Sequence, residues 1–237
     1  MAIGEEITLL ADGTLSITTE GDDDSQTFSY TVTSSDGVND TALVTVNTVA
    51  YFASGTMIDI PDGPKLIDDL ETGDMITTLD SGSQAIRWIG HSLRNATGND
   101  APVHVSKNAM GYEHDAFEVS QNHRLLLEDG QAELLYVEAE VLVKAKDMIK
   151  DHSIRIRKDA KPVVYFHLLF EKHEIIFGNN VLSESFFPGR QAMKSFDAET
   201  HEEVLRLMPT IDQFQGYGYG PTARTVLRTY ESRVLLN

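Results

Sequence analysis

The chain has 237 residues, of which 41% are hydrophobic and 24% charged, and it carries a formal charge of −18. This composition is that of a globular protein, and the negative charge argues against nucleic acid and anionic membranes as partners, because phosphate groups are bound by clustered Lys and Arg. The chain has no cysteine, which excludes disulfides, thiolate zinc sites and a cysteine nucleophile.

Segments that would send the chain into or across a membrane are not expected. No apolar run reaches about 18 residues, so we expect no membrane-spanning helix. The first ten residues, "MAIGEEITLL", lack the basic start and the small-residue cleavage site of a signal peptide, so we expect none.

Residues 1–50 differ from the rest of the chain in charge, with nine Asp and Glu and no Lys or Arg. Segments 13–33 and 38–49 alternate polar and apolar residues and are rich in Thr and Val, which predicts half-buried strands. The Asp-Gly pair in the intervening "SSDGVND" predicts a turn. Because so few strands make a poor independent sheet, we predict that 1–50 is the end of a larger β domain that flanks a second domain.

Residues 51–190 are predicted to be a compact all-β domain. Short runs with strand character recur there, separated by Gly, Asp and Asn turns, and helical patterns are few. Such a series favours a fold of bent β-hairpins. The expected strands are 56–60, 74–79, 84–90, 102–105, 116–120, 124–127, 140–144, 152–156, 163–170 and 173–177.

Residues 191–237 are predicted to form a small helical C-terminal extension. Residues 197–208 have carboxylates in the first turn and end before Pro209, which is typical of a helix. A second helix is expected over 221–235, because Pro221 suits a first turn. Within it, one apolar stripe predicts a face that docks on the core: Ala223, Leu227, Tyr230 and Val234.

Four stretches together resemble one protein family, three of them within residues 51–189 and the fourth in the tail from residue 191. "YFASGTMIDIPDGPKLIDDLETGDMI" (51–76) resembles its N-terminal block, a nucleophile followed by x-x-x-G-T and later L-x-x-G-D-x-I/V, and "SQNH" (120–123) resembles its T-x-x-H motif. "YFHLLFEKHEIIFGNNVLSESFFPG" (165–189) resembles its C-terminal block. In this order the stretches resemble the Hint family, which contains hedgehog autoprocessing domains, inteins and bacterial intein-like domains.

The flanking segments add to this resemblance. The tail from residue 191 resembles the helical extension of a bacterial Hint subfamily that is attached to secreted or surface proteins. Residues 1–50 resemble the end of a cadherin-like repeat. An extracellular or cell-surface location is therefore implied by the resemblance.

The resemblance implies self-processing. In this family the first residue attacks the carbonyl before it and converts a peptide bond into an ester or thioester, which an acceptor such as water, an amine or a thiol then cleaves. Segment 1–50 would be the acyl donor. His123 would protonate the departing nitrogen, with a pKa expected near neutral, and Ser120 would orient the bond. Since residues i and i+3 of a strand face opposite ways, the chain must turn between Ser120 and His123.

The nucleophile position departs from the family. Counting back four residues from Gly55 gives Tyr51, whose phenol oxygen lies across a rigid ring and is too far from the preceding carbonyl to close a five-membered ring. If the register is one residue earlier, the position is Ala50, which has no nucleophile. We therefore expect this chain to be catalytically inactive.

The C-terminal positions depart as well. His173 matches a family histidine, but ten residues beyond it Ser183 replaces the penultimate His, Glu184 replaces the cyclising Asn, and Ser185 takes the downstream nucleophile position. A carboxylate has no amide nitrogen with which to form a succinimide. We expect N-terminal cleavage or transfer in an intact parent, and no splicing.

Other readings remain open. The family requires no cofactor or metal, and the spacing of His167, Glu171 and His173 fits no zinc pattern, so a structural role is favoured for them. The acidic stretches 22–24 and 36–40 match no EF-hand loop and are read as solvated turns. Two rival functions are a non-enzymatic surface or adhesion module with this core as its scaffold, and a calcium-stabilised structural domain.

Overall fold

The computed structural model describes residues 6–9, 15–18, 25–33, 39–47, 50–150, 152–188, 193, 198–209, 211 and 218–236. The chain divides into two units, Met1–Thr48 and Val49–Asn237. The roles expected for 1–50, 51–190 and 191–237 stay predictions. Within the described ranges, no helix combines the length and the apolar character needed to cross a membrane.

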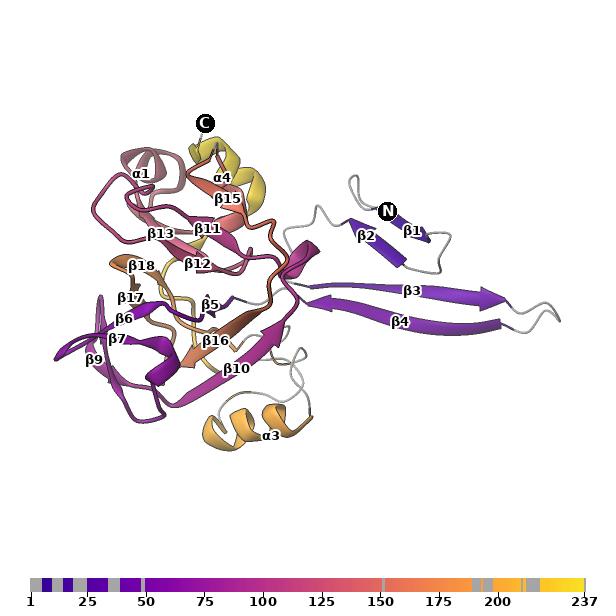
Figure 1. Cartoon of the computed structure of the whole chain (residues 1–237), viewed down its shortest axis with the longest axis horizontal. Helices are drawn as coiled ribbons and strands as arrows, with labels where there is room; N and C mark the ends of the chain where they lie inside the picture. The colour runs from indigo at the N-terminus through magenta and orange to yellow at the C-terminus, as the bar shows by residue number, and fades with distance from the viewer. Residues whose placement is uncertain are drawn as a thin grey trace. The chain divides into compact units, whose positions relative to one another are not determined.

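The first unit contains two antiparallel strand pairs (Figure 1). β1 (Glu6–Leu9) pairs with β2 (Leu15–Thr18), and β3 (Ser25–Thr33) pairs with β4 (Asn39–Asn47). β2, β3 and β4 lie in the segments 13–33 and 38–49, where alternating Thr and Val predicted strands, whereas β1 lies before them and was not predicted. The acidic stretch 22–24 and residues 36–38 of the other lie outside the described residues, so the calcium reading stays a prediction.

The second unit is built on two sheets, which confirms the all-β expectation. The six-stranded sheet has the order β10-β16-β5-β12-β11-β15. Its strands are β5 (Phe52–Ala53), β10 (Trp88–Arg94), β11 (Val103–Val105), β12 (Phe117–Val119), β15 (Ile154–Ile156) and β16 (Val163–Leu169).

The nine-stranded sheet has the order β19-β14-β13-β18-β17-β6-β7, and β8 joins it through β17 and carries β9 at its other edge. Its strands are β6 (Met57–Ile60), β7 (Gly63–Leu66), β8 (Met75–Thr78), β9 (Gly82–Ala85), β13 (Arg124–Glu128), β14 (Glu140–Lys144), β17 (Ile175–Gly178), β18 (Val181–Glu184) and β19 (Thr225–Val226).

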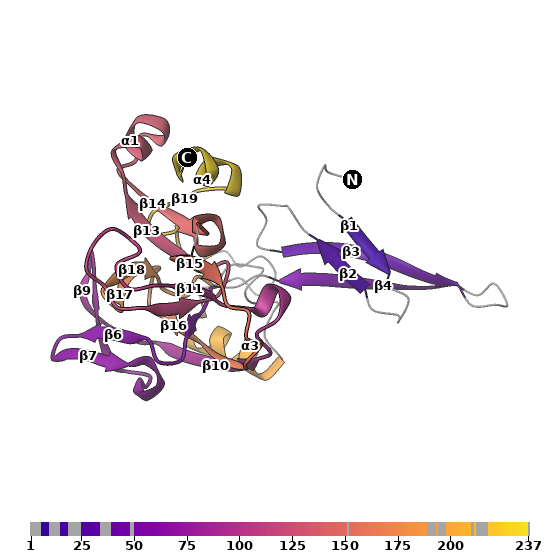
Figure 2. The ribbon, with the colours of Figure 1, turned by 45° about the horizontal axis from the view of Figure 1, so that its top comes forward.

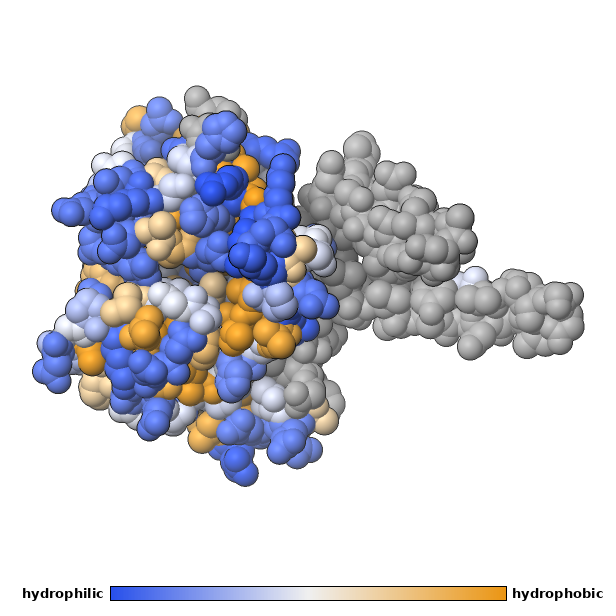
Figure 3. All heavy atoms as spheres, in the orientation of Figure 1, coloured by the Kyte–Doolittle hydropathy of each residue, from blue (hydrophilic) through white to orange (hydrophobic). Residues whose placement is uncertain are grey.

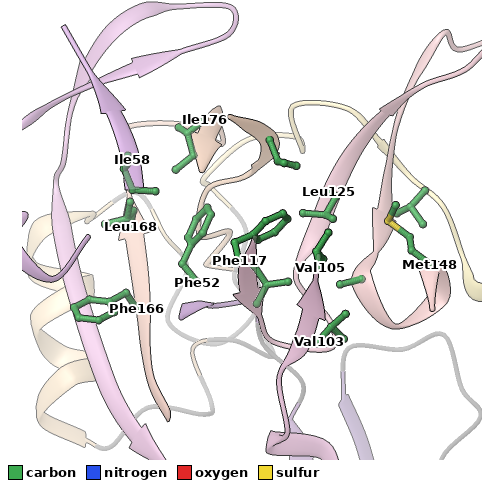
Figure 4. Close-up of a cluster of buried hydrophobic side chains, with 14 of the residues drawn as sticks. Phe52, Ile58, Val103, Val105, Phe117, Leu125, Met148, Phe166, Leu168 and Ile176 are labelled. Atoms are coloured by element: carbon green, nitrogen blue, oxygen red, sulfur yellow. The ribbon is translucent and has the colours of Figure 1, made fainter. Parts of the chain in front are cut away.

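Buried apolar side chains from both sheets share one core. Phe52 of the short strand β5 packs among side chains from its own sheet and from the other one (Figure 4). Its ring lies so close to β17 that a Cβ added at Gly178 would be 2.9 Å from its Cε1 atom. The labelled members are Phe52, Ile58, Val103, Val105, Phe117, Leu125, Met148, Phe166, Leu168 and Ile176.

The helices are short. Helix α1 (Gly130–Tyr136), which the sequence analysis did not predict, begins after Asp129, whose carboxylate accepts the Gln131 N–H at 2.7 Å. Helix α3 (Ala198–Leu207) confirms the helix expected over 197–208. The others are α4 (Thr229–Leu236) and three 3₁₀ turns, η1 (Ile67–Asp69), η2 (Gly98–Asp100) and η3 (Ala145–Met148).

The helix expected over 221–235 is wrong in its first half. Thr225 and Val226 form β19, which pairs in parallel with β14, because β-branched residues gain more from the sheet edge than from a helix. The expected docking stripe is wrong as well, since Tyr230 and Val234 are 54% and 57% exposed. Leu235 is the buried apolar residue of α4.

Helices α1 and α4 lie side by side in both ribbon views (Figures 1 and 2). The Tyr136 hydroxyl donates a hydrogen bond to the carbonyl oxygen of Glu231 at 2.9 Å and so connects them. Hydrophilic residues cover most of the described surface visible in Figure 3, with separate apolar areas between them.

Candidate functional site

The candidate site begins where the chain enters β5. This strand has only two residues, yet it lies between two neighbours: Phe52 pairs with Phe166 of β16 on one side and with Val119 of β12 on the other. Beyond the strand, the Ser54 N–H donates to the Val164 carbonyl at 2.8 Å. The short strand β5 is therefore held in place on both sides.

Ser120, directly after β12, is joined to Tyr51 by two hydrogen bonds. The Tyr51 N–H donates to the Ser120 side-chain oxygen at 3.0 Å, and the Ser120 N–H donates to the Tyr51 carbonyl at 3.0 Å. The nitrogen of the Ala50–Tyr51 peptide bond is therefore within hydrogen-bond distance of the Ser120 side chain. The chain then turns, because the His123 N–H donates to the Ser120 carbonyl at 3.1 Å. This is the turn expected between the two residues.

His167, on β16, lies on the other side of the same peptide bond, and the sequence analysis did not assign it to the site. Burial lowers its pKa to about 3, and a hydrogen bond to the Ala50 backbone opposes that shift. This hydrogen bond raises the pKa of His167, so it stabilises the protonated imidazole, which means that a ring N–H is the donor. The acceptor is therefore the carbonyl oxygen of Ala50. The centroids of the His167 and Tyr51 rings are 4.1 Å apart. The sequence signal that could have pointed to His167 is its position as an ionisable residue within the otherwise mostly apolar strand β16.

His123 is almost fully buried beside β5. Its ring lies edge-on against Phe52 with centroids 4.3 Å apart, and neither ring nitrogen has a hydrogen-bond partner among the described residues. Burial lowers its pKa to about 4, so the expectation of a near-neutral pKa is wrong. The physical reason is that an imidazolium ion at this position would lose its hydration. The role of His123 as proton donor stays a prediction.

Tyr51, at the expected nucleophile position, has its ring packed. The ring stacks on Tyr165 with centroids 5.2 Å apart and lies against His167 on its other side. Ala50, the alternative position, is half-buried and contributes its backbone to the bond with His167. Within this group the structure brings together Ala50, Tyr51, Ser120 and His167, and the His123 ring lies against Phe52, the residue that follows Tyr51.

The C-terminal positions form a second cluster. Both oxygens of Glu184 are bound by Arg124: Oε1 accepts the backbone N–H and Oε2 accepts a guanidinium N–H, each at 3.0 Å. Burial raises the pKa of Glu184, but Arg124 and His173 outweigh it and hold that pKa at about 2. The carboxylate is fully buried and ionised. Since Arg124 directly follows His123, the two clusters adjoin.

His173 and Ser185 are committed to structural hydrogen bonds. The Nδ1 atom of His173 accepts the Ala223 N–H at 2.9 Å, so Nε2 carries the proton, and it lies 3.1 Å from the Ser185 carbonyl oxygen and 3.4 Å from Glu184. The Ser185 side-chain oxygen accepts the Glu174 N–H at 2.9 Å. Ser183 lies on β18 opposite Leu125. The arrangement fixes β18 against β13 and presents no amide group for cyclisation.

A metal site is not formed within the part of the chain that the structure describes. No group of three or more His, Asp or Glu side chains there is placed to hold a metal ion. His167 and His173, which the sequence analysis considered as ligands, belong to the two different clusters described above.

Comparisons with known proteins give one family. A family model described as "Hint domain" matches residues 50–190. A solved structure, the solution structure of a bacterial intein-like domain from Clostridium thermocellum, is 13% identical, covers 57% of this chain and 97% of its own, and has a TM-score of 0.41. No curated protein matches. Because this family model matches more than half of the chain, the chain belongs to the Hint domain family.

Proposed function

We propose that this chain carries a self-processing domain that activates the Ala50–Tyr51 peptide bond for acyl transfer, and that it lacks the nucleophile needed to complete the reaction. One observation carries the proposal: side chains bind both polar groups of this peptide unit. Ser120 accepts its N–H at 3.0 Å, and His167 binds the backbone of Ala50. The position of both bonds favours Tyr51 over Ala50 as the first residue of the domain.

In this mechanism the two sides of the peptide bond have different partners. A peptide bond resists attack because resonance gives it double-bond character. The His167 N–H on the carbonyl oxygen would stabilise the negative charge that develops there during attack. Ser120 would hold the nitrogen in register. The proton that the nitrogen needs in order to leave would come from the imidazolium form of His123, which is the minor form at neutral pH because burial lowers its pKa to about 4. The acyl donor is the segment before residue 51, and the acceptor is water, an amine or a thiol.

The missing element is a short nucleophilic side chain. A Cys at position 51 would reach the Ala50 carbonyl through a five-membered ring and would be a few per cent thiolate at pH 7. The Tyr51 phenol oxygen stands at the far end of a planar ring, which packs between Tyr165 and His167. Splicing is not proposed, because the Glu184 carboxylate has no amide nitrogen and is bound by Arg124.

The test is to restore the nucleophile. Tyr51→Cys, incubated with hydroxylamine or dithiothreitol, should release a fragment that corresponds to residues 1–50. The parent chain should remain one 26.3 kDa species, as measured by intact mass. Ala50→Cys is the matched control and should not be cleaved. Its thiol would face the carbonyl of residue 49, one peptide bond before the one that Ser120 holds. Cleavage of the unmodified chain at this bond, or a folded Tyr51→Cys variant that stays intact, would contradict the proposal.

A second candidate is a non-enzymatic module that keeps this core as a scaffold. It is favoured by the Tyr51 ring, which packs against buried residues on both sides and so turns the nucleophile position into part of the core. This candidate predicts that Tyr51→Cys loses stability and gains no reactivity. Unfolding curves and the cleavage assay on the same variant decide between the two functions.

A further inference from the structure

A cavity of about 280 Å³ adjoins the proposed site. Tyr51 and His167, two residues of the proposed site, form part of its lining. Residues of β10 and α3 complete its walls, among them Trp88, Ser92, Arg94 and Glu203. We call this space the acceptor cavity.

A glycine on β10 makes the cavity possible. Gly90 lies opposite His167 in the β10–β16 ladder. A Cβ atom at Gly90 would lie 2.1 Å from Cη2 of Trp88, so the absent side chain lets the indole lie across the strand. In that position the indole Nε1–H donates to the Glu203 carboxylate of α3 at 3.1 Å. The aromatic wall and the acidic group are thereby fixed relative to each other.

Two further polar groups of the cavity, on Ser92 and Arg94, have no hydrogen-bond or ion-pair partner of the following kinds among the described residues. The Ser92 Oγ atom is buried and has no hydrogen-bond partner among the described residues. Arg94 forms no ion pair with any carboxylate in the described ranges. Buried polar atoms are nearly always satisfied by protein, water or ligand. The cavity therefore offers a cation, an anion, a hydroxyl and an aromatic face to whatever occupies it.

We propose that the acceptor cavity binds a small zwitterion, a free α-amino acid, as the acyl acceptor of the reaction. Its carboxylate would pair with Arg94 and its ammonium group with Glu203 and the face of Trp88. At about 280 Å³ the space lies at the small end for ligand pockets, which argues against a large apolar acceptor. Water alone would need neither charge. This inference rests on the proposed function, because only an activated bond gives the acceptor something to attack.

The transfer balances without a further reactant. In a chain with Cys at position 51, the acyl carbon of Ala50 is bonded to the Cys sulfur after the acyl shift. The amino nitrogen, once deprotonated, attacks that carbon and forms an amide, while the carbon–sulfur bond breaks and the sulfur leaves as a thiolate that takes up a proton. The products are the N-terminal segment amidated by the amino acid, the free thiol, and one proton released to solvent.

Binding can be measured on the unmodified chain, because Trp88 is its single tryptophan and lines the cavity. Glycine should change the tryptophan fluorescence in a saturable way. Ethanolamine, which lacks the carboxylate, and acetate, which lacks the ammonium group, should bind at least about tenfold more weakly, the effect of one lost charge contact. Arg94→Gln should abolish the preference of glycine over ethanolamine. No saturable change with glycine, or equal binding of the three probes, would overturn the site.

The chemical arm separates this inference from the proposed function. In Tyr51→Cys, hydroxylamine cleaves any thioester and so reports on the acyl shift alone. Glycine should outpace ethanolamine at equal concentration of free amine, and Arg94→Gln should remove that difference when each rate is divided by the hydroxylamine rate of the same variant. Cleavage by hydroxylamine without any preference for glycine would refute the amino acid as acceptor and leave the proposed function intact. The absence of cleavage by hydroxylamine would refute the proposed function, and the fluorescence titration would still decide whether the cavity binds a zwitterion.

Discussion

Ser120 and Tyr51 are joined in both directions, since the Tyr51 N–H donates to the Ser120 hydroxyl oxygen and the Ser120 N–H donates to the Tyr51 carbonyl, each at 3.0 Å. The second bond extends the pairing of β12 with β5 by one residue. The first leaves that ladder and uses a side chain to hold the peptide nitrogen. Ser120 therefore contributes its backbone to the sheet and its side chain to the candidate site.

Removing this hydroxyl should weaken the activated site. In the Tyr51→Cys background, Ser120→Ala should slow hydroxylamine-induced cleavage by roughly 5-fold, since one hydrogen bond to a reacting group is worth about 1 kcal/mol. A gel time course with mass confirmation measures the rate. Ser83→Ala, an exposed serine on β9, is the control. An unchanged rate for Ser120→Ala would remove Ser120 from the mechanism.

The two buried histidines should be distinguishable by rate. In the same background, His167→Ala should slow cleavage by about 10²–10³-fold, because it removes a donor to the carbonyl oxygen. His123→Ala should slow it by about 10²–10⁴-fold if His123 supplies the proton. The exposed His152→Ala is the control. Full activity of His167→Ala would show that the Ala50 carbonyl needs no donor from β16.

The domain should lose stability in mild acid. The pKa values of His123 and His167 are lowered to about 4 and about 3 by burial, so between pH 6.5 and 4 the unfolded chain binds more protons than the folded one. The free energy of unfolding should therefore fall as pH drops through this window, by about 3 kcal/mol for His123 alone. Urea titrations at several pH values measure the slope. His123→Gln should make it shallower, whereas His152→Gln should leave it unchanged.

The buried ion pair should be sensitive to loss of one partner. Glu184→Ala leaves the Arg124 charge without its carboxylate and should lower the free energy of unfolding by about 3–5 kcal/mol. Glu171→Ala is the control. It breaks an ion pair with Arg87 that is also short, at 2.6 Å, but lies on the surface, so it should change the free energy of unfolding little. Equal effects in chemical denaturation would contradict the role of burial. Glu184→Asn should yield no cleavage after residue 184.

Helix α1 should be stabilised by a change at its end. Val137 has a left-handed backbone, φ 62°, and is 87% exposed, so its side chain is strained there without packing in return. Val137→Gly should raise the free energy of unfolding by about 1 kcal/mol. Leu134→Gly, in the exposed interior of the same helix, should lower it by about 1 kcal/mol. If both variants lose stability in thermal or urea unfolding, Val137 makes a contact that its exposure conceals.

The sequence predicted the strands whose pattern is local. Residues 140–144 were expected as a strand and form β14, and the turn between Ser120 and His123 follows from the strand period alone. β5 was missed because two residues are too few to show a period. β19 was missed because it exists only through its pairing with β14, a contact between distant segments.

The candidate site divides in the same way. Ser120 and His123 were found because they stand in a short motif. His167 was not assigned, because its place beside Ala50 depends on β16 lying next to β5, more than 110 residues earlier in the chain. The pKa of His123 required knowledge of its burial, which no local pattern supplied. The acceptor cavity depends on Gly90, Trp88 and Glu203, which meet only in the folded chain.

The pairing of β5 on both sides also bears on the direction of the chemistry. After an acyl shift, the freed amine of residue 51 would still be anchored by β12 and β16, within reach of the ester or thioester that it had just left. Such proximity corresponds to an effective molarity on the order of 10⁵–10⁸ M for the back-reaction, and the amide is the more stable product. The intact and shifted forms would therefore interconvert with the equilibrium on the side of the intact chain. Net release would be set by how often an acceptor intercepts the minor form, which makes acceptor concentration, rather than the shift itself, the quantity that controls processing.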